Sequence, residues 1–93
     1  MKYVYPALFT ACGEGGYVVE FPDLPGCYTQ GDDLFDALYM AESLLSEWLE
    51  YLADKGHPIP EASSLNNIKP DNGELVSLIR AEVTVDTKVA VNA

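Results

Sequence analysis

The sequence predicts an α+β fold, a two-layer sandwich in which one amphipathic helix packs on an antiparallel-rich sheet in the order β-β-β-α-β. Two observations support this fold class. The first thirty residues alternate in the manner of short strands and are interrupted by glycine and proline turns. One long stretch with helical spacing of apolar residues follows, and its apolar stripe has only the sheet to pack against.

The first three strands are expected at residues 2–10, 17–21 and 27–30. In the first, side chains at odd and even positions form two distinct faces, and Pro6 leaves one side of its backbone unpaired. The second is rich in β-branched and aromatic residues. Three glycines within residues 11–16 predict a hairpin loop. Two prolines and Gly26 within residues 22–26 predict a dense turn.

The helix is expected to begin at Leu34, because Asp33 is a favoured N-cap residue and Asp36 provides a carboxylate variant of the capping box. Gly56 is the expected residue after the C-cap, and Pro58 prevents continuation. The predicted apolar stripe comprises Leu34, Ala37, Leu38, Ala41, Leu44, Leu45, Trp48, Leu49 and Leu52. A loop over residues 58–73 then leads to a strand over residues 74–85, and residues 87–93 alternate again.

Length and charge limit the classes of function. The 93 residues fit one small domain, and a core this small favours a homodimer or a higher homo-oligomer. The formal net charge of −10 argues against binding of nucleic acid or anionic membranes by this segment. No apolar run is long enough for a membrane span, and two cysteines are too few for a disulfide scaffold, so we expect a cytoplasmic protein.

The acidic excess points to a basic protein partner. Residues 1–60 hold ten of the fifteen acidic side chains but only two of the five basic ones. A solvated face is the simpler explanation for acids on a helix, yet the uneven distribution favours the three strands and the helix as a docking surface. The candidate contact residues on the outer helix face are Glu42, Glu47, Glu50 and Asp54.

The residues that could act in catalysis or bind a metal can each be explained by a structural role. We therefore expect no catalysis, no metal and no other cofactor. The candidates are His57, Cys12, Cys27 and the group Asp32, Asp33 and Asp36. The lone histidine follows a helix end, where its charge would suit the helix dipole. The cysteines are expected to pack as small apolar residues, and helix capping accounts for the three aspartates.

Taken together, these motifs resemble the HicB-type antitoxin family over about residues 2–85. The matching stretches are residues 3–7, 15–19, 21–27, 30–32 and 56–61, with Ala37 and Ala41 in the helix. The most specific is Phe-Pro-Asp-Leu-Pro-Gly-Cys at residues 21–27. The motif residues, for which we expect structural roles, are Gly16, Phe21, Pro22, Asp23, Leu24, Pro25, Gly26, Gly31 and Pro58.

The resemblance implies a partly degraded ribonuclease-H-like fold and the antitoxin role of a type II toxin–antitoxin pair. The implied partner is a small basic HicA-type toxin that cleaves messenger RNA and is neutralised by occlusion. Residues 1–86 would form the HicB-like domain. Residues 87–93 look like the opening strand of a truncated ribbon-helix-helix DNA-binding module, without which we expect no promoter binding by this segment.

Two alternatives remain open from the sequence. A nuclease remnant would need carboxylates that converge on a metal, for which Glu20, Asp23, Asp36, Glu74 and Glu82 are the available candidates. A stand-alone dimerising or ligand-binding module is the other alternative.

Overall fold

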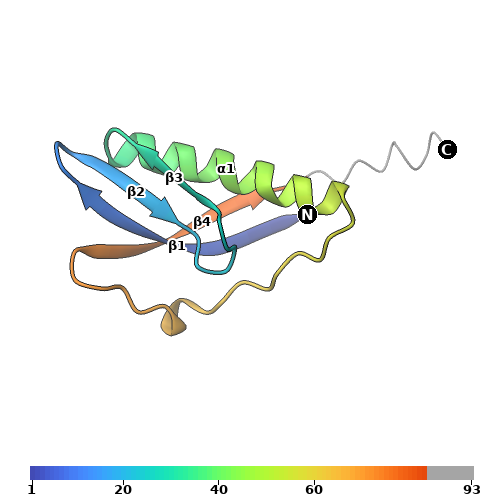
Figure 1. Ribbon diagram of the computed structural model, residues 1–93. Coiled ribbons are helices and arrows are strands. Elements are labelled where there is room, and N and C mark those ends of the chain that lie inside the picture. The colour runs from blue at the N-terminus through green and yellow to red at the C-terminus, as the bar shows by residue number, and fades with distance from the viewer. Residues whose placement is uncertain (84–93) are drawn as a thin grey trace.

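The computed structural model describes residues 1–83, which form one helix layer on one sheet layer (Figure 1). The strands are β1 (Lys2–Cys12), β2 (Gly16–Glu20), β3 (Tyr28–Gly31) and β4 (Glu74–Glu82), and helix α1 (Leu34–Asp54) lies between β3 and β4 in the chain. A short 3-10 helix, η1 (Leu65–Asn67), interrupts the long connection from α1 to β4. The predicted fold class and element order are confirmed. The tail predicted at residues 87–93 and the end of the last predicted strand lie outside the described residues.

The sheet has the order β3-β2-β1-β4, and every neighbouring pair is antiparallel. β1 is eleven residues long. It pairs with β4 along most of its length and with β2 at its C-terminal end. Pro6 fits this central strand because its nitrogen faces away from β4 and β2 pairs only with residues 8–12 of β1. The sequence-based expectation of an unpaired position at Pro6 is therefore confirmed.

The hydrophobic core fills the space between α1 and one face of the sheet. The helix contributes the buried residues Ala37, Ala41, Leu45 and Leu49, and the sheet contributes Tyr5, Ala7, Phe9, Val19, Ile79 and Ala81. Leu38, Leu44, Trp48 and Leu52 pack at its margin. Leu34 is exposed, so its predicted place in the apolar stripe is wrong. It is the first helical residue, and the helix first meets the sheet where Ala37 packs against Gly31.

Both ends of α1 are capped by the predicted residues. The backbone N–H of Asp36 donates to Oδ1 of Asp33 over 2.8 Å, and Oδ2 of Asp36 accepts from the N–H of Asp32 over 2.9 Å. In the usual capping box the side chain at the Asp36 position accepts from the N–H of the N-cap residue, whereas here it accepts from the residue before the N-cap. At the other end Gly56 has φ of +73°, and the N–H of His57 donates to the carbonyl of Leu52 in a Schellman arrangement.

Candidate functional site

Helix α1 carries acidic side chains and no basic ones. Five acidic and no basic residues lie between Leu34 and Asp54. The four predicted contact residues, Glu42, Glu47, Glu50 and Asp54, are all exposed. Glu47, Glu50 and Asp54 follow each other at intervals of three and four residues and so share one stripe of the helix. Glu42 lies apart from this acidic stripe, on the side of the helix that faces β4.

Exposed aromatic side chains flank the acidic stripe on α1. Tyr51 is 57% exposed, and Phe35 is 84% exposed at the start of the helix, one turn before the exposed Tyr39. Aromatic side chains are enriched at protein–protein interfaces relative to the rest of the surface, so these residues are candidates for contact with a partner. These residues were not predicted, because they fall outside the apolar stripe. Their helical spacing away from that stripe is the signal that could have identified them.

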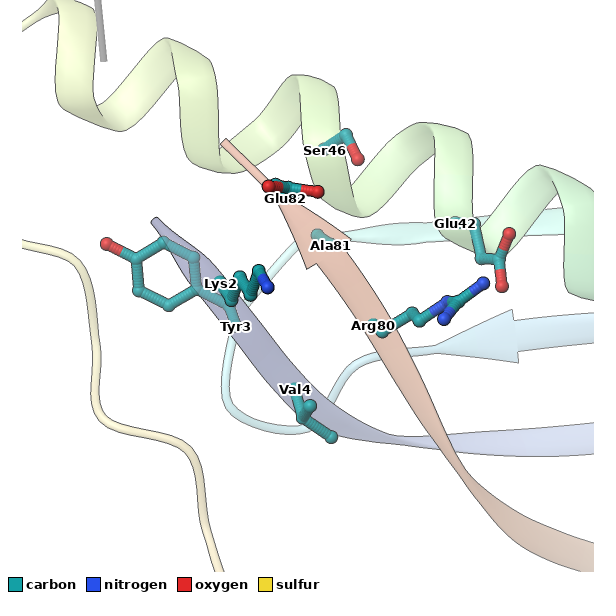
Figure 2. A pocket seen from close by; sticks show the side chains of 8 residues that line it. All are labelled: Lys2, Tyr3, Val4, Glu42, Ser46, Arg80, Ala81 and Glu82. Carbon is teal, nitrogen blue, oxygen red and sulfur yellow. The ribbon is translucent and has the colours of Figure 1, made fainter. Parts of the chain in front are cut away.

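A groove of about 570 Å³ lies at the surface where α1 meets the edge strand β4 (Figure 2). Its lining comprises Lys2, Tyr3, Val4, Glu42, Ser46, Arg80, Ala81 and Glu82. The side chains of Arg80 and Glu42 point toward one another across it (Figure 2). The groove was not predicted, because the sequence alone does not show that the last strand lies at the edge of the sheet beside the helix.

The motif at residues 21–27 forms two successive tight turns between β2 and β3. The N–H of Leu24 donates to the carbonyl of Phe21 over 3.0 Å, and the N–H of Cys27 donates to the carbonyl of Leu24 over 2.9 Å. Gly26, with φ of +85°, occupies the position of the second turn where a left-handed conformation is required. Phe21, Leu24 and Cys27 are buried, whereas Pro22 and Pro25 are exposed. The motif therefore anchors the turn in the core.

Asp23 ties this turn to the long connection between α1 and β4. Its Oδ2 accepts from the backbone N–H of Ser63 over 2.8 Å, and its Oδ1 accepts from the Ser63 hydroxyl over 2.6 Å. Nearby along the same connection, the hydroxyl of Tyr5 donates to the carbonyl of Pro60. These contacts join residues 40 and 55 positions apart, so no local sequence signal indicates them.

The remaining motif residues act through close packing or lie at the surface. A Cβ on Gly31 would lie 2.4 Å from the backbone nitrogen of Ala37, and a Cβ on Gly16 would lie 3.2 Å from the carbonyl oxygen of Gly31. Both positions therefore let β2, β3 and α1 approach each other. Pro58 is exposed just after the helix end.

The residues considered for catalysis are not gathered into one site. His57 is exposed beside Tyr51, with ring centroids 6.4 Å apart. Cys27 is buried, as predicted, and burial raises the pKa of its thiol to about 11. Cys12 is exposed, so its predicted packing role is wrong: it ends β1 at the hairpin, beyond the reach of the core.

The carboxylates proposed for a nuclease lie in separate places. Asp23 holds Ser63, Glu74 accepts from the N–H of Asp71 over 2.7 Å, Asp36 caps α1, and Glu82 lines the groove. Within residues 1–83, no group of three or more His, Cys, Asp or Glu side chains is arranged to hold a metal ion. In the same range, no helix is both long and apolar enough to cross a membrane.

Comparison with known proteins gives consistent matches. A family model described as the HicB-like antitoxin of bacterial toxin–antitoxin systems matches residues 5–92. Over 63 residues the chain is 35% identical to Antitoxin HicB of Escherichia coli strain K12. This match covers 68% of this chain and 46% of the E. coli protein. The chain thus spans about half the length of this curated relative.

Solved structures of low sequence identity share the fold. A chain of the toxin–antitoxin complex from Streptococcus pneumoniae matches with a TM-score of 0.79 and 24% identity, covering 88% of this chain and 70% of that chain. A chain of the HicA3 and HicB3 toxin–antitoxin complex matches with a TM-score of 0.70 and 23% identity, covering 86% of this chain and 99% of that chain.

Proposed function

The chain belongs to the HicB-like antitoxin family of bacterial toxin–antitoxin systems, and we propose that it binds a small basic HicA-type toxin and neutralises it by occlusion. It does so in the cytoplasm, by binding and not by catalysis. The observation that carries the proposal is the outer face of α1, where exposed acids and aromatics occur together and no basic residue lies between Leu34 and Asp54.

Charge complementarity supports this partner. A protein that binds messenger RNA has to present a positive surface to phosphate, and an antitoxin with a net charge of −10 is attracted to that same surface. Complementary potentials raise the association rate and select against acidic partners. One similar solved structure is a complex of HicA3 with HicB3, which is in keeping with a toxin of the HicA type as the partner.

The acidic stripe and Tyr51 form the centre of the proposed contact. Tyr51 lies one helical turn after Glu47 and one helical turn before Lys55, whose ammonium lies 5.9 Å from the centroid of the tyrosine ring. Binding hot spots commonly combine a tyrosine that excludes water with surrounding polar contacts. We propose that Tyr51 packs on the toxin while Glu47, Glu50 and Asp54 pair with its basic side chains.

Charge reversal on the helix tests the contact surface. The purified chain is titrated into purified toxin, and the dissociation constant is measured for wild type and for the triple variant Glu47→Lys, Glu50→Lys and Asp54→Lys. The matched control reverses three exposed acids elsewhere, Glu14→Lys, Glu61→Lys and Asp71→Lys, which changes the net charge equally.

The two triple variants separate a local contact from a net-charge effect. The helix variant is expected to bind at least about 100-fold more weakly, about 2.8 kcal/mol, and the control about tenfold more weakly at most. Equal losses in both would refute the helix as the contact surface. Binding by the wild type that leaves RNA cleavage by the toxin undiminished would refute occlusion.

A further inference from the structure

We propose that two copies of this chain pair through β4, so that the two four-stranded sheets join into one continuous antiparallel sheet. The sheet has two edges, and they are unlike. β3 is only four residues long, whereas β4 is nine residues long and contains no proline. Its register with β1 is uninterrupted from Glu74 to Glu82, so no bulge deforms it. Long regular edges of this kind readily accept another strand.

The backbone of β4 offers hydrogen-bonding groups at alternate residues. Val83 and Met1 exchange backbone bonds of 2.7 and 2.6 Å, which sets the odd-numbered residues of β4 toward β1. Since the register is constant, the N–H and carbonyl groups of Val76, Leu78 and Arg80 point to the open edge. Within residues 1–83, these three N–H groups have no backbone acceptor in another element or turn.

The side chains of β4 are complementary to those of a second, antiparallel β4. When Ser77 lies opposite its own copy, Val76 faces Leu78 of the partner subunit and Glu74 faces Arg80 of the partner subunit. In the single chain Glu74 accepts from the N–H of Asp71 over 2.7 Å and Arg80 points toward Glu42, so the proposed pair requires Arg80 to turn from Glu42 to the partner subunit. This register brings the outward-pointing backbone groups of the two strands opposite each other. Two-fold symmetry makes each of these contacts twice.

A neighbouring register in which the outward-pointing backbone groups also lie opposite each other is less favourable. A shift that places Leu78 on the axis sets Glu74 opposite Glu82 of the partner subunit, and like charges directly across a strand pair destabilise it. The favoured register also covers Leu78, which is 52% exposed in the single chain. Of these two registers, charge and apolar contacts favour the one centred on Ser77.

A charge swap tests this interface in the intact chain. The dimer dissociation constant is measured by sedimentation equilibrium for wild type, Arg80→Glu, Glu74→Arg and the double variant that carries both changes. Lys69→Glu is the matched control, because it makes the same change of charge as Arg80→Glu at an exposed loop position. Far-ultraviolet circular dichroism establishes that each variant is folded.

The expected pattern is a dimer in wild type that either single variant weakens about tenfold or more, about 1.4 kcal/mol. The double variant restores most of the affinity, and Lys69→Glu leaves it unchanged. A wild-type chain that remains monomeric at high concentration would overturn the proposal. So would a dimer that Arg80→Glu weakens no more than Lys69→Glu does.

Amide hydrogen exchange gives a second readout that needs no variant. The amides of Val76, Leu78 and Arg80 face the open edge and exchange slowly only when a second strand covers them. The amides of Ser77 and Ile79 face β1 and serve as internal references. Slow exchange at the three edge positions, lost on dilution, is expected, and fast exchange at all concentrations would contradict the interface.

Discussion

Gly31 allows α1 to start directly against β3, and replacing it with alanine should separate the two elements. A Cβ at this position would lie 2.4 Å from the backbone nitrogen of Ala37, 2.5 Å from its Cα and 2.8 Å from the carbonyl carbon of Asp36. Non-bonded carbon contacts normally lie at about 3.5–4.0 Å, so the first turn of the helix has to move by about 1 Å. All three atoms belong to the backbone, and no side-chain rotation can relieve the clash.

The cost follows from the packing that this shift disturbs. Overpacking a close-packed region destabilises a protein by about 1–3 kcal/mol. Since Ala37 and Ala41 on the first turns are fully buried, we expect Gly31→Ala to lie in the upper part of that range, at about 2 kcal/mol or more. For a domain of this size 2 kcal/mol corresponds to a fall in Tm of roughly 8–16 °C.

Thermal unfolding followed by circular dichroism measures this effect, and Gly13→Ala is the matched control. A Cβ at Gly13 would meet no atom within 4 Å, and the glycine does not have positive φ. The control should therefore unfold within about 0.5 kcal/mol of wild type, or be slightly more stable. Similar Tm values for both variants would show that the close approach of β3 and α1 does not constrain the fold.

Three further experiments test the turn at residues 22–26, the bonds of Asp23 to Ser63 and the buried thiol of Cys27. Gly26→Val should lower stability by about 1–2 kcal/mol in urea unfolding, because φ of +85° strains a β-branched residue; an unchanged midpoint would contradict this. Asp23→Ala should speed amide exchange around Ser63 without changing exchange in α1, because it removes two hydrogen bonds to that residue; unaltered rates would show that Asp23 does not hold the connection. The free energy of unfolding should fall as the pH rises from about 9 to about 11, because burial raises the pKa of Cys27 to about 11 while the unfolded thiol ionises near 9.0. Cys27→Ala should flatten part of that decline, and identical pH profiles would exclude this thiol as a source.

Local signals predicted the helix and its ends well. Asp33, Asp36 and Gly56 act within one helical turn of their own positions, so their roles follow from nearby residues alone. The two tight turns at residues 21–27 were predictable for the same reason, because proline and glycine limit the backbone at fixed offsets. The departures at these ends are small: Asp36 bonds to Asp32 instead of Asp33, and Leu34 precedes the first packed turn.

Features that depend on distant contacts could not be predicted. The bonds from Ser63 to Asp23 join segments that meet only once the sheet has formed. The groove beside Arg80 exists because β4 pairs with β1 at the edge of the sheet, an order that alternation along the chain does not specify. The exposure of Phe35 and Tyr51 could not be predicted either, because hydrophobic patterning shows which side chains face solvent only once the buried face of the helix is known.

We propose that the acidic outer face of α1 binds a basic ribonuclease. The most direct measurement is the cleavage of RNA by purified toxin as the chain is added in increasing amounts, at low and at high salt. We expect cleavage to fall to zero at stoichiometric amounts of the wild-type chain, whereas the triple variant at Glu47, Glu50 and Asp54 should be needed in large excess. Stoichiometric inhibition by that variant, unaffected by salt, would contradict it.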